Sequence, residues 1–146
     1  MTATISTQAE WFDNYVSSTM SILGVHAPDS DGDLPVRGRT SPGWVRVETR
    51  EPWGVRVFAY AATGVPAKAA VLTELNAVQA SDRLVRVHLT RDGIVVVEHL
   101  LLADAVGTDA LRSVIARVLE VADRVGPMLA TVHGGQVPLS PPTAEA

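Results

Sequence analysis

The sequence predicts an α+β domain in which one antiparallel sheet of about five strands carries its helices on one face. Three observations lead to this prediction. Several short segments have valine at every second position, three longer segments have apolar residues at helical spacing, and most strand-to-strand links are short. Because a sheet with one apolar side has to bury that side, we expect the helices to cover it. The expected order of elements is αβββαββα.

The first helix is predicted over residues 8–23. Thr7 and Glu10 have the spacing of a capping box, and Gly24 stands where a left-handed glycine commonly ends a helix. The residues that recur at helical spacing are Trp11, Phe12, Tyr15, Val16, Thr19, Ile22 and Leu23.

Three strands are predicted next. Residues 34–39 fit a short edge strand, because Pro35 has no N–H to donate to a ladder. Residues 44–50 and 55–61 alternate valine with larger or polar residues, which is the pattern of half-buried strands. The segment Glu51-Pro52-Trp53-Gly54 is expected to form the turn between them.

A second helix and a hairpin follow. Pro66 fits the first turn of a helix over residues 66–80. Residues 84–90 and 94–101 have the pattern of two strands, and Asp92-Gly93 suits a two-residue type I′ turn. That turn would place one set of side chains toward the core: Val85, Val87, Leu89, Ile94, Val96 and Leu100. The opposite face would carry Arg86, His88, Thr90, Val95, Val97 and His99.

The last helix is predicted from Thr108 to the glycine pair Gly134-Gly135, with a kink or break near Gly126 because Pro127 follows it. Residues 1–136 are expected to form a single domain. Residues 137–146 contain three prolines and no periodic pattern, which predicts a flexible C-terminal tail.

Composition narrows the class of protein. The chain has 146 residues, a formal net charge of −4 and no cysteine. The acidic balance argues against a nucleic-acid partner, and the lack of cysteine excludes disulfides and thiolate metal sites. No apolar run is long enough to span a membrane, and the first ten residues lack the pattern of a secretory signal. These features predict a cytoplasmic location and no membrane partner.

Two groups of residues were weighed as metal sites. Asp29, Asp31 and Asp33 resemble a calcium loop, but the glycine and glutamate that an EF-hand needs are absent, and an Asx-rich turn requires the same residues. His88 and His99 are expected to share a face beside Arg86, with Glu98 pointing the other way, so no third ligand completes a zinc site. We therefore expect no metal and no cofactor.

Motifs of catalysis are also missing. The sequence has no nucleophile elbow, no Walker loop and no dinucleotide fingerprint. Gly134 and Gly135 end a helix after His133, whereas a phosphate-binding glycine loop precedes one. We therefore expect that the protein is not an enzyme.

The mixed face of the predicted sheet is the candidate binding site. Aromatic residues interleaved with arginine are typical of protein-binding surfaces. The residues concerned are Trp44, Arg46, Arg56, Phe58, Tyr60, Arg86 and His88. A helix packed over this face, or simple solvation, would account for the same pattern.

The chain resembles the YbjN-like family, which groups with the type III secretion chaperone fold, over residues 31–135. The resemblance rests on Asp31-Gly-Asp-Leu-Pro-Val36, the paired strands around Pro52, Leu75-Asn76, the glycine-turned hairpin, Ala122-Asp123 and Gly134-Gly135. It implies the αβββαββα fold and a non-enzymatic, chaperone-like role in binding a protein or peptide client. It also allows a homodimer. The family offers no catalytic residues to carry over.

Three functional hypotheses follow. The first is an intracellular module that binds a protein or peptide segment on the mixed sheet face. The second is a regulatory or sensory domain that binds a small anion or metal through Arg56, Arg86, His88 and His99. The third, a hydrolase with a scattered active site, has the least support.

Overall fold

The computed structural model describes residues 2–139, with side chains from Thr7 onward, and confirms the predicted α+β order. The elements, in chain order, are α1 (Thr2–Ile22), β1 (Leu34–Arg37), β2 (Pro42–Glu48), β3 (Gly54–Ala62), α2 (Ala69–Ser81), β4 (Arg86–Leu89), β5 (Val95–Leu102), the short 3-10 turn η1 (Ala103–Ala105) and α3 (Thr108–His133).

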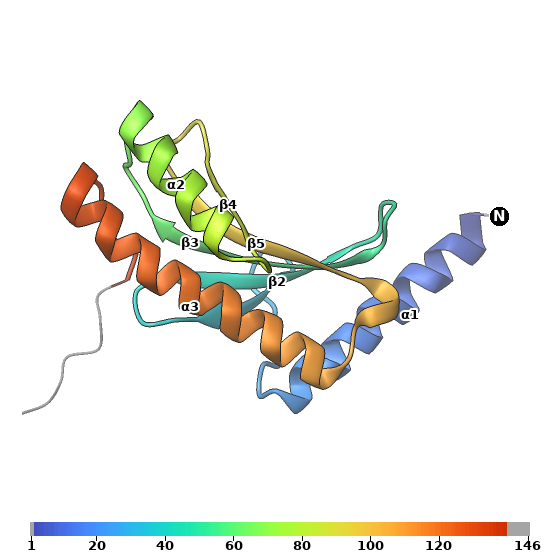
Figure 1. The fold of residues 1–146 in the computed structure, drawn as a ribbon. Coiled ribbons are helices and arrows are strands. Elements are labelled where there is room, and N and C mark those ends of the chain that lie inside the picture. The colour runs from blue at the N-terminus through green and yellow to red at the C-terminus, as the bar shows by residue number, and fades with distance from the viewer. Residues whose placement is uncertain (1, 140–146) are drawn as a thin grey trace, which may run out of the picture.

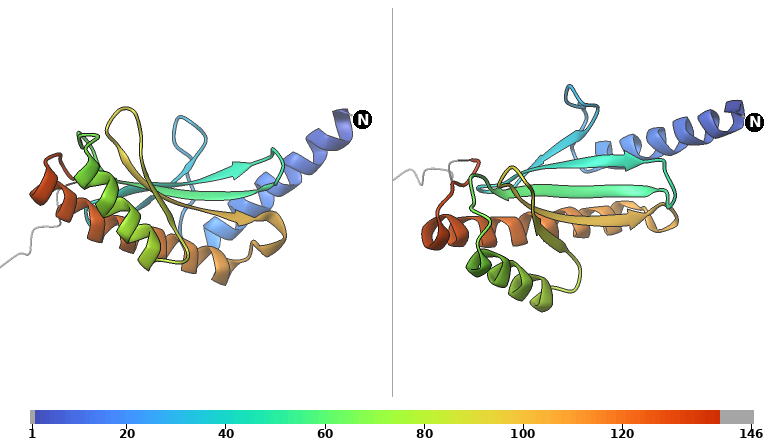
Figure 2. Two further views of the ribbon diagram at one scale, coloured as in Figure 1. Left: turned by 45° about the horizontal axis from the view of Figure 1, so that its top comes forward. Right: turned by 90° about the horizontal axis from the view of Figure 1, so that it is seen from above.

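The five strands form one antiparallel sheet in the order β1-β2-β3-β5-β4. β5 lies between β3 and β4 because α2 carries the chain from β3 to the far edge of the sheet. Helix α3 runs along one face, which we call the inner face, and α2 lies beside β4 (Figure 1). Seen from above, the strands lie in front of α3, and no described helix lies in front of the strands (Figure 2).

The core lies between the inner face and α3. Four valines of β3 and β5 have no exposed surface: Val55, Val57, Val95 and Val97. Leu111 and Leu129 of α3 are equally buried against them. Gly126 allows the closest approach, since a Cβ added there would stand 2.0 Å from the carbonyl oxygen of Ala61. The core therefore depends on small and branched residues that bring helix and sheet together.

Helix α3 continues through Pro127, so of the predicted kink or break near Gly126 the break does not occur. A proline inside a helix removes one backbone hydrogen bond and crowds the preceding turn. Here the residues on both sides of it, Val125 and Leu129, are buried against the sheet. That packing holds the helix together where local propensity would end it.

Two predicted helix starts are also wrong, whereas both predicted glycine ends are confirmed. Helix α1 already includes Thr7, so Thr7 is not its N-cap, and α2 is capped by Lys68 rather than started by Pro66. Gly24 and Gly134 follow α1 and α3 with positive φ angles of 89° and 85°. Glycine tolerates these angles at little cost, which explains why the ends were easier to predict than the starts.

The hairpin between β4 and β5 has a three-residue loop, not the predicted two-residue turn. The Thr90 N–H donates to the Ile94 carbonyl (2.8 Å), and the Gly93 N–H donates to the Thr90 carbonyl (3.1 Å). Among the described residues only glycines have positive φ, so Asp92 does not take the geometry of a type I′ turn. The extra loop residue pairs Leu89 with Val95.

This difference of one residue reverses the faces of β5. Val95 and Val97 lie on the inner face, while Val96, Glu98 and Leu100 lie on the opposite face, which we call the outer face. The predicted faces of β4 remain correct, because Val85 and Val87 are in the core. The predictions for β5 were wrong because the turn type, which sets the register, was wrong.

After α3 the chain returns to the sheet. Gln136 forms a two-way backbone bridge with Thr63, and the Leu139 N–H donates to the Thr40 carbonyl (3.1 Å). Gln136 is the last residue of the predicted domain, and Leu139 belongs to the predicted flexible tail. Residues 140–146 of that tail lie outside the described part of the chain.

Candidate functional site

The outer face brings together all seven residues that the sequence analysis selected. Strand pairing aligns Trp44 with Phe58 and Arg46 with Arg56. Tyr60 and His88 both pair with Val96, one from each side. Arg86 pairs with Glu98, which in turn pairs with Phe58. These side chains therefore occupy one continuous surface across β2, β3, β5 and β4.

An aromatic cluster occupies the β2–β3 part of this face. The rings of Trp44 and Phe58 stack with centroids 5.4 Å apart, and Tyr60 meets Trp44 edge-on at 4.8 Å. Phe58 is buried, whereas Trp44 and Tyr60 are partly exposed. The cluster thus offers two accessible rings on a buried third one.

Two arginines lie over the buried ring. The guanidinium carbons of Arg46 and Arg56 stand 4.9 and 4.4 Å from the centre of Phe58. A cation over an aromatic face is attracted by the ring's quadrupole, and the arginine stem adds apolar cover. These arginines therefore shield Phe58 from water as well as carrying charge.

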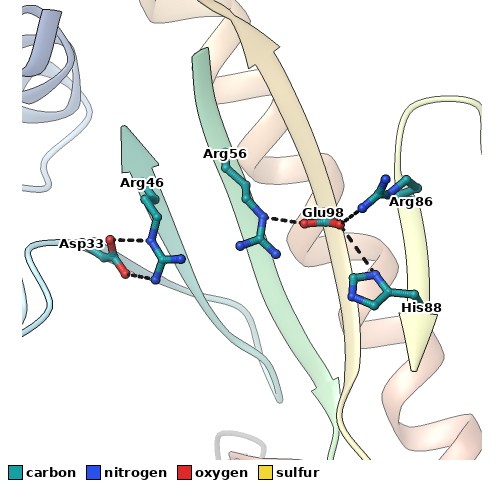
Figure 3. Close-up of polar contacts among 6 residues, drawn as sticks. All are labelled: Asp33, Arg46, Arg56, Arg86, His88 and Glu98. Atoms are coloured by element: carbon teal, nitrogen blue, oxygen red, sulfur yellow. Dashed lines mark hydrogen bonds and ion pairs between the residues drawn. The ribbon is translucent and has the colours of Figure 1, made fainter. Parts of the chain in front are cut away.

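A row of charged residues crosses the outer face from the start of β1 to β4 (Figure 3). Arg46 binds both carboxylate oxygens of Asp33, with Nε–Oδ1 and Nη2–Oδ2 distances of 3.0 and 2.7 Å. Arg56 Nε donates to Glu98 Oε2 at 2.5 Å, and Arg86 donates to Glu98 Oε1. The three arginines named in the sequence analysis are therefore already paired within the protein.

Glu98 is the centre of this row. Its side chain is only 8% exposed, and His88 Nδ1 lies 3.6 Å from Oε1. Burial would raise the pKa of the Glu98 carboxyl, but the hydrogen bonds from Arg86 and Arg56 outweigh burial and lower it. Glu98 is thus held as a carboxylate, and hydrogen bonding to Asp33 raises the pKa of Arg46 in the same way.

Sequence reasoning missed both acidic residues of the row. Glu98 was placed on the inner side by the two-residue turn, and Asp33 was considered only as a possible metal ligand or turn residue. The three-residue alternative for Arg91-Asp92-Gly93, with glycine in the left-handed position, was the available signal for Glu98. No local signal in the sequence pairs Asp33 with Arg46, because β1 and β2 create that contact.

The structure gives no support to the anion or metal hypothesis. His99 lies away from His88, with its Nδ1 2.8 Å from the Leu84 carbonyl oxygen, so the prediction that they share a face is wrong. Glu98 shares the face of His88, contrary to the prediction, and already engages Arg56 and Arg86.

The Asp29–Asp33 segment forms the Asx-type turn that was the favoured interpretation. The carboxylate oxygens of Asp29, Asp31 and Asp33 lie within 4.8 Å of one another. Asp29 Oδ1, however, accepts the backbone N–H of Asp31 and of Asp33, and both oxygens of Asp33 bind Arg46. The cluster is thus explained by local structure and by the ion pair with Arg46.

A cleft of about 730 Å³ opens at the end of the outer face near the β2–β3 turn. Arg56, Arg86 and Glu98 line it, together with Arg50 and Arg83. Among the described residues, neither Arg50 nor Arg83 has an ion-pair partner. The outer face therefore changes along its strands from an aromatic surface to a surface with unpaired arginines.

Across the described part of the chain, no helix has both the length and the apolar character needed to cross a membrane. The outer face combines an accessible aromatic cluster, a fixed network of charges and no described covering helix, which are features of a binding surface.

Comparison with solved structures places the fold among the type III secretion chaperones. One similar structure is a chain of the ExsC–ExsE complex (TM-score 0.64, 11% identity, covering 83% of this chain and 95% of that one). A second is a chain of the heterodimeric ExoU–SpcU complex of Pseudomonas aeruginosa (TM-score 0.60, 19% identity, covering 80% of this chain and 99% of that one). A third comes from the Yersinia pestis type III secretion chaperone SycH in complex with a YscM2 fragment (TM-score 0.57, 14% identity, covering 76% of this chain and 96% of that one).

The family is shown by the sequence itself. Residues 10–141 match the model of TY-Chap1, described as T3SS (YopN, CesT) and YbjN peptide-binding chaperone 1. The chain belongs to this family, which confirms the resemblance found in the sequence. No curated protein matches the chain.

Proposed function

We propose that the protein binds a segment of a protein or peptide client on the outer face of its sheet. The observation that carries this proposal is the aromatic cluster of Trp44, Phe58 and Tyr60 on a face that no described helix covers. The family description, a peptide-binding chaperone, supports the class of ligand. The three similar structures are all of protein complexes, which supports it further.

The client would gain most of its affinity at Trp44 and Tyr60. Large aromatic residues in the middle of an interface commonly contribute most of the binding energy. Their rings are fixed by contact with Phe58, and Phe58 is itself fixed under Arg46 and Arg56. A surface that is ordered before binding loses little side-chain entropy when the client arrives.

The role of arginine differs from the one expected from the sequence. Arg46 and Arg56 are paired with Asp33 and Glu98, so they stabilise the surface and are not free to bind carboxylates of a client. Acidic groups of a client would meet Arg86, whose side chain is 73% exposed, and the unpaired arginines of the adjoining cleft. This arrangement favours a client with apolar residues followed by acidic ones.

We also propose that the protein binds its client without catalysing a reaction, and that it is located in the cytoplasm. The family is described by peptide binding and not by a reaction, which supports the first point. The second continues the expectation from the sequence, and cell fractionation of the tagged chain tests it directly.

The test is a quantitative comparison of partners bound by the tagged wild type and by a Trp44→Ala/Tyr60→Ala variant, identified by mass spectrometry. Both side chains are partly exposed, so the variant should keep its fold, which circular dichroism and thermal unfolding verify. We expect partners of the wild type to be lost from the variant. Size-exclusion chromatography of the same samples reports whether a homodimer forms.

The matched control is Val132→Ala, which removes an exposed apolar side chain from the end of α3, outside the outer face. It should retain all wild-type partners. If the double variant recovers the same partners as the wild type, the outer face is not the binding surface. If no partner binds either protein, the binding function itself is rejected.

A further inference from the structure

A second surface lies in an open groove between α1, the β2–β3 turn and η1. Its volume is about 960 Å³, and it lies on the α1 side of the turn, apart from the aromatic cluster of the outer face. Its lining includes the aromatic residues Trp11, Phe12, Tyr15 and Trp53 and the carboxylates Glu51 and Asp104. Figure 1 shows the three elements concerned, α1, the β2–β3 turn and the segment after β5, toward the same end of the sheet.

Aromatic side chains form the walls of the groove. Trp11 is 66% exposed and stacks on Tyr15, with the ring centroids 5.5 Å apart and the planes inclined by 6°. The ring of Phe12, which is buried, lies beside the ring of Trp53 in the turn, with the two centroids 6.1 Å apart. Such a large exposed tryptophan beside other apolar surface is unusual for a surface that meets only water.

The walls are held in place by contacts within the fold. The Tyr15 hydroxyl donates to the Val106 carbonyl at 3.0 Å, which ties α1 to the segment that precedes α3. The Ala103 N–H donates to the Trp53 carbonyl at 2.9 Å, which ties η1 to the β2–β3 turn. The groove is therefore a preorganised feature of the fold and does not depend on a partner to form.

The charges of the groove have one sign. Glu51 and Asp104 are its two charged lining residues, both are exposed, and neither pairs with a described cation. The outer face differs, since two of its carboxylates, Asp33 and Glu98, are buried and paired with arginine. Two unpaired carboxylates beside aromatic faces attract a cation, because both the charges and the ring quadrupoles favour it.

We propose that this groove binds a partner segment in which lysine or arginine stands among apolar residues. The apolar side chains would cover Trp11 and Trp53, and the cationic group would lie between an aromatic face and Asp104 or Glu51. Arginine suits the position best, since its planar guanidinium stacks on aromatic rings and binds carboxylates at its edge. Glu51 also lines the cleft of the outer face, but the arginines outnumber the carboxylates there, whereas Glu51 and Asp104 are the two charged residues of the groove. The two surfaces would therefore bind segments of opposite charge.

A random peptide library displayed on phage tests the proposal with the whole chain as bait. The outer face would select acidic peptides, so we expect a separate group of selected peptides that share arginine or lysine flanked by apolar or aromatic residues. Their affinity, measured by fluorescence anisotropy of synthetic copies, should fall about tenfold when Glu51→Gln and Asp104→Asn remove the two carboxylates. Trp11→Ala should weaken binding by about tenfold or more.

A control of equal charge separates the groove from the net charge of the chain. Asp13→Asn with Asp92→Asn also removes two exposed carboxylates, but neither residue lines the groove, so binding should stay within about twofold of the wild type. The cationic peptides should also bind the Trp44→Ala/Tyr60→Ala variant normally, which keeps this test independent of the outer face. The proposal is overturned if no group of enriched peptides carries cations, or if the groove variants bind such peptides as the wild type does.

Discussion

The two faces of β3 and β5 are made by alternate residues of the same strands, yet they are stabilised in different ways. On the inner face, Val57 and Val97 have no exposed surface beneath α3. On the outer face, Phe58 and Glu98 are also buried, but arginine side chains of the sheet itself cover them. The inner face is closed by a helix, whereas the outer face is closed only by side chains, which a client would contact without any helix having to move.

The comparison implies that stability depends mainly on the inner face, and the sharpest test is Gly126→Ala. The new methyl would stand 2.0 Å from the carbonyl oxygen of Ala61, so α3 would have to move away from β3. We expect a loss of about 3 kcal/mol or more in the free energy of unfolding, measured by urea denaturation. Gly107→Ala is the control, because a Cβ there meets nothing within 4 Å. Gly107 is the N-cap of α3, where alanine is less favourable than glycine, so a loss of no more than about 1 kcal/mol is expected.

Neighbouring leucines of β5 test the register that separates the faces. Leu101 is 9% exposed on the inner face, and Leu100 is 39% exposed on the outer face. Leu101→Ala should lower the free energy of unfolding by about 2–3 kcal/mol, whereas Leu100→Ala should lower it by less than about 1 kcal/mol. Equal losses, or the reverse order, would contradict the three-residue loop and restore the register predicted from the sequence.

More of the fold than of the candidate site could be predicted from the sequence. Element order and the valine faces of β2, β3 and β4 follow from periodicity, which is a local property. The hairpin register depended on one turn, and Asp92-Gly93 is compatible with loops of two or three residues. The ion pair of Asp33 with Arg46 depends on strand pairing, which no single segment encodes.

Glu98 provides the next test, because it is the buried charge on which the outer face depends. Glu98→Gln leaves Arg56 and Arg86 without their carboxylate, and both arginines reach solvent, so we expect a loss of only about 1–2 kcal/mol at neutral pH. Glu48→Gln is the control on the same face, since Glu48 has no ion-pair partner among the described residues. A loss as large as that from Gly126→Ala would contradict the division of roles between the faces.

The pH dependence of the Glu98 variant checks the same point. Because the pKa of folded Glu98 is lowered, its contribution is fully present above the unfolded value of about 4.3 and is lost as pH falls through the folded value. The difference in the free energy of unfolding between the wild type and Glu98→Gln should therefore shrink below about pH 4. Urea titrations repeated at several pH values measure it. The stability of the Glu98→Gln variant should itself still fall in this range, because the pKa of Asp82 is also lowered, against its burial, by hydrogen bonds from Leu84 and Val85 and by Arg117.

The smallest expected effect concerns the geometry of Arg46. Arg46→Lys keeps the positive charge but loses the two-pronged contact with Asp33 and the planar group over Phe58. We expect a loss of about 0.5–1 kcal/mol in the free energy of unfolding, since the arginine is 40% exposed and water screens the pair. Arg46→Gln should cost more, because it leaves the buried Asp33 carboxylate without a cation. If lysine and glutamine cost the same, the charge of Arg46 contributes nothing, and its role on the outer face is only to cover the ring of Phe58.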